Sequence, residues 1–274
     1  KPDAVLILGD TNASIAAIIT KRYKIPIYHM EAGNRSFDFQ IPEEINRRII
    51  DHIADFNLVY TENSRRHLIA EGLPQRRIYL TGSPMKEVLS YYDIPIKKSK
   101  ILNSLKLNEK KYFLLSIHRE ENVDNKFRLC NLLSIMEKII EYYNMPLIIS
   151  THPRTKKRLK SLKDLKENKN FIFHKPFGFF DYINLQKKSF CTLSDSGTIS
   201  EESSILNFPA VTIRNSIERP EALDTGSIIL TGMDENITIG AIKIAVEEQE
   251  NNWIKSIPEE YKIMDTSKRV LKLI

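Results

Sequence analysis

The sequence predicts an α/β protein made of two doubly wound domains, each built on a parallel sheet. Short apolar runs alternate with stretches of helical periodicity along the whole chain. Strands and helices at this spacing are typical of βα units, whose strands run parallel. A lysine-rich, weakly patterned stretch at 91–111 interrupts the alternation once. Because 274 residues are enough for two medium domains, we expect a boundary there and a cleft between the domains.

The first part of the chain predicts four buried strands, at residues 4–8, 25–30, 56–60 and 77–81. Helical periodicity between them predicts helices at residues 12–22, 42–54, 62–71 and 84–92. Glu43 and Glu44 fall in the first turn of the second helix, where the helix dipole favours negative charge. This succession of strands and helices indicates a first domain at residues 1–95.

After the interruption, apolar runs predict strands at residues 112–117, 146–150, 171–174, 190–193, 210–213 and 227–230. Helices are expected between them, and the longest covers residues 126–143. A final helix at 266–273 follows a linker that contains proline. We therefore expect a second domain at 96–255 and a C-terminal segment, 256–274, that packs back on the first domain.

Composition argues against several classes of protein. The formal net charge is +6, but the lysines are scattered and no nucleic-acid-binding motif occurs, so the charge favours a small anionic partner. No apolar run approaches the roughly 18 residues of a membrane span. Cys130 and Cys191 lie among apolar residues without the spacing of a zinc site, which predicts buried thiols in a reducing compartment. The prediction is a cytoplasmic protein that binds no metal, nucleic acid or membrane.

The predicted helix at 42–54 is rich in both charged and branched apolar residues. Acidic and basic side chains recur at four-residue intervals and predict a salt-bridge ladder of Glu43, Arg47, Asp51 and Asp55. Isoleucines at the same interval predict a core-facing stripe of Ile45, Ile49 and Ile53.

Polar residues follow several of the predicted strands. In open α/β sheets, ligands bind beyond the carboxyl ends of the strands and at helix N-termini. Asp10 occupies such a position, with an ordinary role as a helix cap as its alternative. Glu31 lies too far ahead of the next helix to cap it. The further candidates at strand ends are His118, Arg119, His152 and the run at 194–202.

The run "SDSGTISEE" at 194–202 has the composition of a phosphate site. A Ser-Gly-Thr turn that opens a helix presents backbone N–H groups and hydroxyls to an anion, although the same turn also serves as an ordinary cap. Glu202 lies one to two turns into the helix, where it suits a ribose diol. Neither GxGxxG nor a Walker A sequence occurs, so NAD and ATP are unsupported and no cofactor is expected.

These motifs occur together in one known family. The chain resembles the non-hydrolysing UDP-N-acetylglucosamine 2-epimerases in the order and spacing of "GDT", "EAG", "PEEINRRIIDHIAD", "HREEN", "THPR", "SDSGTISEE" and "ERPEALDTG". The resemblance covers essentially the whole chain, and the combination of motifs is much more specific than any one of them. The form "EAGNRSFD" resembles the branch of the family that supplies capsule and O-antigen sugars.

The resemblance implies a GT-B fold, in which two Rossmann-like domains hold a nucleotide sugar in their cleft. It implies an isomerase that inverts C2 of a UDP-N-acetyl-hexosamine by eliminating UDP to a 2-acetamidoglycal and adding it back. The positions that match catalytic residues are Asp10, Glu31, Glu43 and His118, without an assignment of acid and base. The positions that match UDP and sugar contacts are Tyr182, Ser196, Gly197, Thr198, Glu202 and Arg219, joined by Arg119 and His152 in the neighbouring motifs.

The chain departs from the family pattern at three places. Glu120 in "HREEN" replaces an arginine and reverses one charge near the sugar or a UDP-sugar effector. Thr198 replaces the second glycine of an "SGG" turn. The family also begins with roughly two further βα units, about 60–80 residues, so we expect the N-terminal part of the first domain to be missing from this chain. The family suggests a homodimer.

Three other functions stay open on the sequence. A GT-B glycosyltransferase would use the same phosphate site but would not need carboxylates at the strand ends of the first domain. A hydrolysing 2-epimerase would release free sugar and UDP. A non-catalytic nucleotide-sugar-binding fragment would bind UDP without exchanging the C2 proton.

Overall fold

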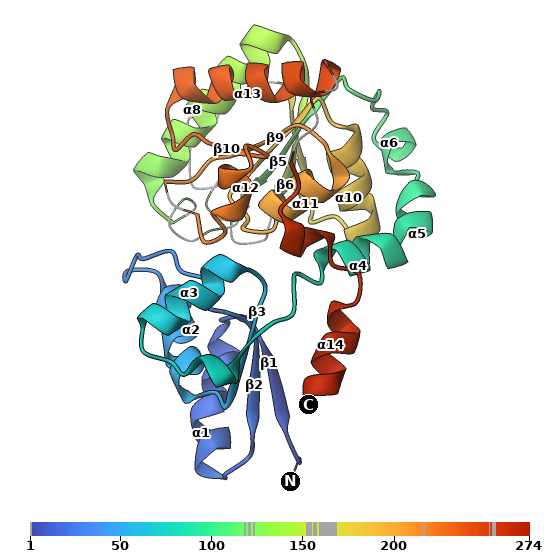
Figure 1. The fold of residues 1–274 in the computed structure, drawn as a ribbon. Helices are drawn as coiled ribbons and strands as arrows, with labels where there is room; N and C mark the ends of the chain where they lie inside the picture. Colours follow the sequence, from blue (N-terminus) through green and yellow to red (C-terminus); the bar gives the residue numbers. More distant parts are fainter. Residues whose placement is uncertain are drawn as a thin grey trace. The chain divides into compact units, whose positions relative to one another are not determined.

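The computed structural model forms two compact units, and each carries its own parallel sheet with helices packed on it (Figure 1). The first unit comprises Lys1–Ser90, Ile217–Glu221 and Ile257–Ile274, and the second comprises Tyr91–Ser216 and Ala222–Ser256. The residues that the structure describes are 2–117, 119, 122, 124–151, 155, 158, 169–215, 217–251, 253 and 256–274. The predicted α/β class with two parallel sheets is confirmed.

The sheet of the first unit has four parallel strands in sequential order: β1 (Val5–Leu8), β2 (Ile27–Ala32), β3 (Phe56–Val59) and β4 (Ile78–Leu80). The segments between and after them form η1 (Asn12–Ile15), α1 (Ala16–Arg22), α2 (Pro42–Ile53), α3 (Glu62–Ala70), η2 (Gln75–Arg77) and α4 (Met85–Tyr91). Right-handed crossovers between neighbouring parallel strands place their helices on one face of a sheet. Accordingly, α1, α2 and α3 lie on the same face here (Figure 1).

The last helix, α14 (Thr266–Leu273), covers the opposite face of this sheet. Its Val270 packs against Tyr28 of β2 and Leu58 of β3 in one buried cluster. The Thr266 hydroxyl donates to the backbone carbonyls of Thr81 and Ser83, both at 3.2 Å. The C-terminal segment, which also contains η3 (Glu259–Lys262), is therefore an integral layer of the first unit.

The sheet of the second unit has six parallel strands in the order β10-β9-β8-β5-β6-β7. They are β5 (Phe113–Ile117), β6 (Leu147–Thr151), β7 (Phe171–His174), β8 (Cys191–Ser194), β9 (Ala210–Thr212) and β10 (Ile229–Leu230). Numbered within the unit, this order is 6-5-4-1-2-3, the doubly wound order of dinucleotide-binding folds. The chain reverses its direction of winding between β5 and β8, so these two adjacent strands mark a topological switch point.

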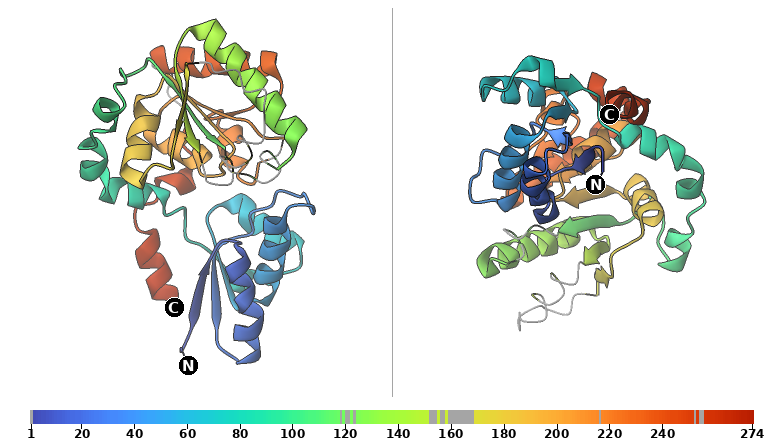
Figure 2. Two further views of the ribbon diagram at one scale, coloured as in Figure 1. Left: turned by 180° about the vertical axis from the view of Figure 1, so that it is seen from behind. Right: turned by 90° about the horizontal axis from the view of Figure 1, so that it is seen from below.

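Helices cover both faces of this sheet (Figure 2). On one face, α8 (Lys126–Tyr143) and α13 (Glu235–Glu250) pack over the largest apolar core of the described residues. On the other face, α6 (Ile101–Ser104) and α10 (Phe179–Lys188) pack over a second cluster that contains Tyr112, Leu114, Ile148 and Leu185. The remaining helices of the described second part are α5 (Asp93–Lys97), α11 (Ile199–Leu206) and α12 (Glu221–Asp224).

All ten predicted strands occur, with ends displaced by at most a few residues. The lysine-rich stretch at 91–111, where a boundary was expected, holds the short helices α5 and α6, and the second unit begins at Tyr91. The prediction of two buried thiols is half wrong: Cys191 is buried in β8, whereas Cys130 lies on the outer side of α8 and is exposed. Among the described residues, none of the helices combines the length and the hydropathy that crossing a bilayer requires.

The packing of α8 generates a stability prediction. Ile139 is fully buried in the core under α8, and Ile139→Ala should lower the free energy of unfolding by about 2–5 kcal/mol because it leaves a cavity. Ile94 of α5 is 65% exposed, so Ile94→Ala should change it by less than about 0.5 kcal/mol. Urea unfolding of both variants measures the difference, and equal effects would contradict this core.

Candidate functional site

Two of the predicted catalytic carboxylates lie at neighbouring strand ends of the first unit. β1 and β2 are paired with Leu8 opposite Met30, so Asp10 and Glu31 both leave the sheet at its carboxyl edge. The register of β2 against β3 shifts between Met30 and Ala32, and Glu31 itself has a left-handed backbone with φ of 65°. Such an irregularity re-aims a side chain and costs free energy, which is why it clusters at functional sites.

Gly9 permits the close approach of the two strand ends. Its φ is +71°, and a Cβ atom built on it would lie 3.0 Å from Oε2 of Glu31. Its backbone N–H donates to the Met30 carbonyl at 3.1 Å. A larger residue at this position would therefore push against the Glu31 carboxylate.

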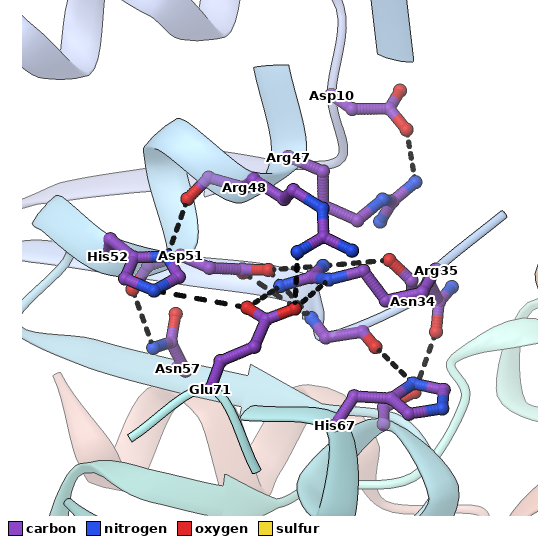
Figure 3. A network of polar contacts seen from close by, with 12 residues as sticks. Asp10, Asn34, Arg35, Arg47, Arg48, Asp51, His52, Asn57, His67 and Glu71 are labelled. Atoms are coloured by element: carbon purple, nitrogen blue, oxygen red, sulfur yellow. Dashed lines mark hydrogen bonds and ion pairs between the residues drawn. The ribbon is translucent and has the colours of Figure 1, made fainter. Parts of the chain in front are cut away.

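Two arginines neutralise the carboxylates. Arg47 of α2 is almost fully buried and forms an ion pair with Asp10 (Figure 3). It also approaches Oε1 of Glu31 to 3.8 Å. The same guanidinium donates to the backbone carbonyl of Glu31. Arg219, from the Ile217–Glu221 segment of the first unit, forms an ion pair with Oε1 of Glu31. The site is thus a chain of alternating charges, Asp10, Arg47, Glu31 and Arg219.

The surroundings move the pKa values of the two carboxyls in opposite directions. Burial raises the pKa of Asp10, and Arg47 offsets only part of that effect while Glu31 adds to it. Burial would also raise the pKa of Glu31, but Arg219 and Arg47 outweigh it and hold that pKa below its usual value. Carboxyls in one site whose pKa values are driven apart are suited to act as an acid and a base.

A second network of charged side chains lies below the Asp10–Arg47 ion pair in the view of Figure 3. Asp51 of α2 is fully buried, and its carboxylate contacts Nη1 of Arg35 at 2.7 Å and the His29 ring at 2.8 Å. Arg35 also donates to both carboxylate oxygens of Glu71, at 2.8 and 2.7 Å. Arg48 joins Glu71 to Glu44, again at 2.8 and 2.7 Å. Each buried charge therefore has an oppositely charged partner, as low dielectric requires.

The predicted salt-bridge ladder along α2 is wrong. Arg47 and Asp51 turn inward to the two networks, and Asp55 pairs with Lys21 of α1. The i, i+4 pair that α2 does form is Glu44–Arg48.

The predicted isoleucine stripe is correct only in part, because Ile53 is partly buried and packs against the core cluster whereas Ile45 does not. Ile45 is 44% exposed, whereas Ile50 and Ala54 are buried against the sheet. Positions 47, 50, 51 and 54 follow the helical period, so two charged residues occupy the inward face of α2.

Glu43 does not join the carboxylate chain. It is exposed in the first turn of α2 and acts on the site through its negative charge, which helps to raise the pKa of Asp10. His118 and His152 lie outside the described residues, as does Glu120.

The predicted phosphate turn lies at the switch point of the second unit. Ser194 ends β8, and Thr198 precedes α11 as its N-cap residue. The hydroxyls of Ser196 and Thr198 lie 3.0 Å apart on either side of Gly197. In this topology ligands bind beyond the carboxyl ends of the two strands at the reversal, here β5 and β8.

Asp195 joins the two strand ends at this point. Its carboxylate accepts from the backbone N–H of Arg119 and from Asn122 Nδ2, both at 3.1 Å. The Arg119 Nε donates to the Asp195 carbonyl at 3.0 Å. Arg119 is thereby held against the turn that contains Ser196.

Tyr182 and Glu202 come together through Gln186. Gln186 Nε2 donates to Oε2 of Glu202 at 2.6 Å, and the side chains of Ser116 and Gln186 lie near enough to the Tyr182 hydroxyl to lower its pKa. Burial raises the pKa of Tyr182, and the neighbouring Glu202 adds to this effect. The structure thus brings together Tyr182, Glu202 and the turn region within the second unit.

Sequence reasoning missed several residues of these sites. The sequence places Arg47 and Asp51 in a salt-bridge ladder along the helix. For Asp195, Gln186 and His29 it offers no signal beyond positions near strand ends or in a helix. The charged residues at the helical spacing of Ile50 and Ala54 were the signal that could have placed Arg47 and Asp51 on the buried face.

Within the described part of the chain, no three His, Cys, Asp or Glu side chains are grouped as metal ligands would be.

The fold and these strand-end sites define an α/β protein of the GT-B type. The family model of UDP-N-acetylglucosamine 2-epimerase matches residues 1–274, and the chain belongs to this family of isomerases. The curated UDP-N-acetylglucosamine 2-epimerase of Methanocaldococcus jannaschii is 40% identical over 261 residues, which cover 92% of this chain and 71% of that protein.

Solved structures agree with this assignment. The UDP-N-acetylglucosamine 2-epimerase from Rickettsia bellii is 48% identical, with a TM-score of 0.92 over 99% of this chain and 73% of that one. The M. jannaschii enzyme, solved in complex with UDP-GlcNAc and UDP, is 36% identical with a TM-score of 0.91 over 99% of this chain and 75% of that one. The chain therefore spans about three quarters of the length of these structures.

Removing Arg47 should change the protonation of Asp10. Because the Arg47 charge lowers the pKa of Asp10, Arg47→Gln should raise that pKa further above its ordinary value. Carboxyl ¹³C NMR of labelled aspartate over a pH series measures the change. Arg48→Gln is the matched control, since Arg48 pairs with Glu44 and Glu71 instead. A lower or unchanged pKa of Asp10 in Arg47→Gln would contradict the pairing.

Removing the charge of Asp51 should destabilise the first unit. Asp51→Asn leaves Arg35 and His29 without one partner, so the free energy of unfolding at neutral pH should fall by about 3–5 kcal/mol. Burial would raise the pKa of Asp51, but the hydrogen bonds and charges of His29 and Arg35 outweigh it and hold that pKa below its ordinary value. The stabilisation by Asp51 is therefore present above the ordinary pKa of an aspartate and is lost as the pH falls through the lower pKa of the folded state.

Urea unfolding between pH 3 and pH 7 measures this effect. The difference in the free energy of unfolding between wild type and Asp51→Asn should become smaller towards acid pH. Asp55→Asn is the control, because the Lys21–Asp55 pair is partly exposed and such pairs contribute only about 0–1 kcal/mol. If this difference became larger in acid, the lowered pKa of Asp51 and its pairing with His29 and Arg35 would be contradicted.

Proposed function

We propose that this protein inverts C2 of UDP-N-acetylglucosamine, or of a closely related UDP-N-acetyl-hexosamine, with Glu31 and Asp10 as the proton-transfer pair. Family membership supports the activity. The observation that carries the proposed chemistry is the pair of adjacent strand-end carboxyls whose pKa values are shifted in opposite directions. A reaction that removes a proton from one face of a carbon and returns it to the other needs one base and one acid.

Glu31 is the base for the substrate with the gluco configuration. Arg219 and Arg47 keep its carboxylate ionised in the resting site. The left-handed backbone of Glu31 and the bulge of β2 aim it away from the regular strand direction. Its side chain keeps 17% exposure, so a proton that it removes exchanges with solvent.

Asp10 is the acid that acts on the opposite face. Its raised pKa keeps the carboxyl closer to the protonated form than an ordinary aspartate. Asn46 Nδ2 donates to its backbone carbonyl at 2.9 Å and Arg47 pairs with its carboxylate, so its position is fixed from α2. In the reverse direction the two residues exchange roles.

The proposed reaction consists of an elimination and a re-addition of UDP. The Glu31 carboxylate takes the C2 proton, the C–H electron pair forms the C1=C2 double bond, and UDP leaves C1 with the electrons of the C1–O bond. The Asp10 carboxyl then delivers a proton to C2 on the other face, and a β-phosphate oxygen of UDP forms the new bond at C1. Charge that develops on the departing UDP needs positively polarised donors nearby.

We assign the UDP portion to residues of the second unit. Ser196, Gly197 and Thr198 at the start of α11 suit the β-phosphate, since a helix N-terminus and its preceding turn attract anions. Glu202 and Tyr182 are proposed for the ribose and the uracil. Further contacts to UDP or the sugar are assigned to Arg119, His152 and Arg219, and His118 and Glu43 are retained as catalytic candidates.

The finer assignments rest on sequence motifs. "EAGNRSFD" favours the branch of the family that makes capsule and O-antigen sugars, and Glu120 favours a substrate or a UDP-sugar effector different from those of the commoner enzymes. We also propose that the protein is a cytoplasmic homodimer. Its subunit is divided into a first domain at 1–95, a second domain at 96–255 and a C-terminal segment at 256–274. Product analysis with UDP-N-acetyl-hexosamines and their 6-deoxy and uronic variants identifies the sugar.

The two carboxyls should give different phenotypes when the full-length protein is assayed in D2O with UDP-N-acetylglucosamine. Glu31→Gln should lose both C2 proton exchange and epimerisation, by about 10²-fold or more. Asp10→Asn should still exchange the C2 proton while epimerisation falls by a similar factor, because the first half-reaction is intact. Proton NMR of the C2 signal and of the new epimer measures both quantities.

Glu259→Gln serves as control, because the Glu259 side chain is 84% exposed on η3. With the manno epimer as substrate the two phenotypes should be interchanged. The same phenotype for both variants in both directions would overturn the assignment of roles. Intact C2 protons across a panel of sugars that the wild-type protein binds would overturn the epimerase itself.

A further inference from the structure

His29 is a buried, titratable residue that the proposed proton transfers do not use. It lies in the middle of β2, with no exposed surface, between the two polar networks. Its Nδ1 is 2.8 Å from Oδ1 of Asp51, and its Nε2 is 3.1 Å from the backbone carbonyl of Gly9 (Asp51 is drawn in Figure 3). Both ring nitrogens therefore face oxygen atoms.

These partners fix the hydrogen positions on the ring. A backbone carbonyl only accepts, so Nε2 must carry a proton. The Asp51 carboxylate also accepts two contacts from the Gly33 N–H and one from Arg35, so it behaves as an ionised acceptor and Nδ1 must carry a proton as well. A ring that donates from both nitrogens is an imidazolium.

Charge balance in the buried network leads to the same state. The anions that surround the ring or its direct partner are Asp51, Glu71 and Glu44, and the cations are Arg35 and Arg48. A positive ring on His29 equalises the charges of this set, and the remaining basic side chain beside Glu71, the half-exposed His52, comes no closer to it than 3.9 Å. Uncompensated buried charge is costly, so the cationic form of His29 fits its surroundings.

The Nε2 contact restrains the backbone next to Asp10. Gly9 is held at its N–H by the Met30 carbonyl and at its carbonyl by His29, and the Glu31 carboxylate leaves no room for a side chain at this position. Asp10 is the next residue, and α2 holds its carbonyl and its carboxylate. His29 is the one of these restraints that connects Gly9 to the Asp51 network.

We infer that His29 is a positioning residue: its imidazolium, anchored by Asp51, holds the Gly9 carbonyl and thereby sets the Asp10 carboxyl relative to Glu31. This inference rests on the proposed role of Asp10 as the acid for the second face. The ordinary alternative is a core histidine that only stabilises the fold. The two differ in whether loss of the Nε2 contact changes the course of the reaction or only the free energy of unfolding.

Two substitutions separate the contacts of the ring in the full-length protein. In His29→Gln the side-chain amide nitrogen takes the place of Nε2 and keeps the donor to Gly9. In His29→Asn the amide nitrogen takes the place of Nδ1 and keeps the donor to Asp51. Each variant retains one contact and loses the positive charge, so both should lose stability.

The measurement is C2 proton exchange and epimerisation in D2O with UDP-N-acetylglucosamine, together with KM and urea unfolding. His29→Asn should reproduce the Asp10→Asn phenotype, with epimerisation reduced by about 10²-fold, C2 exchange retained and KM little changed. His29→Gln should epimerise much faster than His29→Asn at equal or lower stability. Rates that follow stability alone, with exchange and epimerisation falling together, would overturn the inference.

The wild-type protein gives an independent test if neither variant folds. Selective ¹⁵N labelling of histidine should reveal two slowly exchanging N–H protons on one ring, assigned to His29, at neutral pH. A single N–H on that ring would overturn the inference. Wild-type protein that fails to exchange the C2 proton would instead refute the proposed function, so the two failures are distinguishable.

Discussion

The first unit depends on how charge is neutralised at the carboxyl edge of its sheet. Adjacent parallel strands bring Asp10 and Glu31 to the same edge, and two carboxylates there would repel each other. Arg47 of α2 lies between them, and its burial makes its ion pairs stronger than they would be in water. The placement of α2, the left-handed backbone at Glu31 and the glycine at position 9 are all consistent with this requirement.

The buried polar layer beneath the site extends that requirement into the scaffold. Asp51, Arg35 and Glu71 connect α2, the loop after β2 and the end of α3 with charge-assisted hydrogen bonds, each of which leaves little freedom of orientation. Because a half-satisfied network of this kind is costly, the side chains that reach the site are held in one arrangement. The same residues that stabilise the unit therefore fix the geometry on which the proposed proton transfers depend.

The second unit uses a different physical principle. Its sheet reverses winding between β5 and β8, so the segments after these strands diverge at the edge where ligands bind in this topology. Asp195 ties Arg119 to the turn with Ser196, and Gln186 ties Glu202 to Tyr182. Here topology, rather than paired buried charge, selects the site.

The sequence by itself determined the α/β class, all ten strands and the strand-end positions of Asp10, Glu31 and the 194–202 turn, because period and chain order are local properties. Only the tertiary structure decided which face of α2 is buried. Local periodicity favoured a buried face with Ile45, Ile49 and Ile53. In the structure, Arg47 and Asp51 lie on the inner face, where Arg47 pairs with Asp10 and Asp51 pairs with Arg35. Such a demand arises from residues far apart in the chain, and no local pattern in the helix records it.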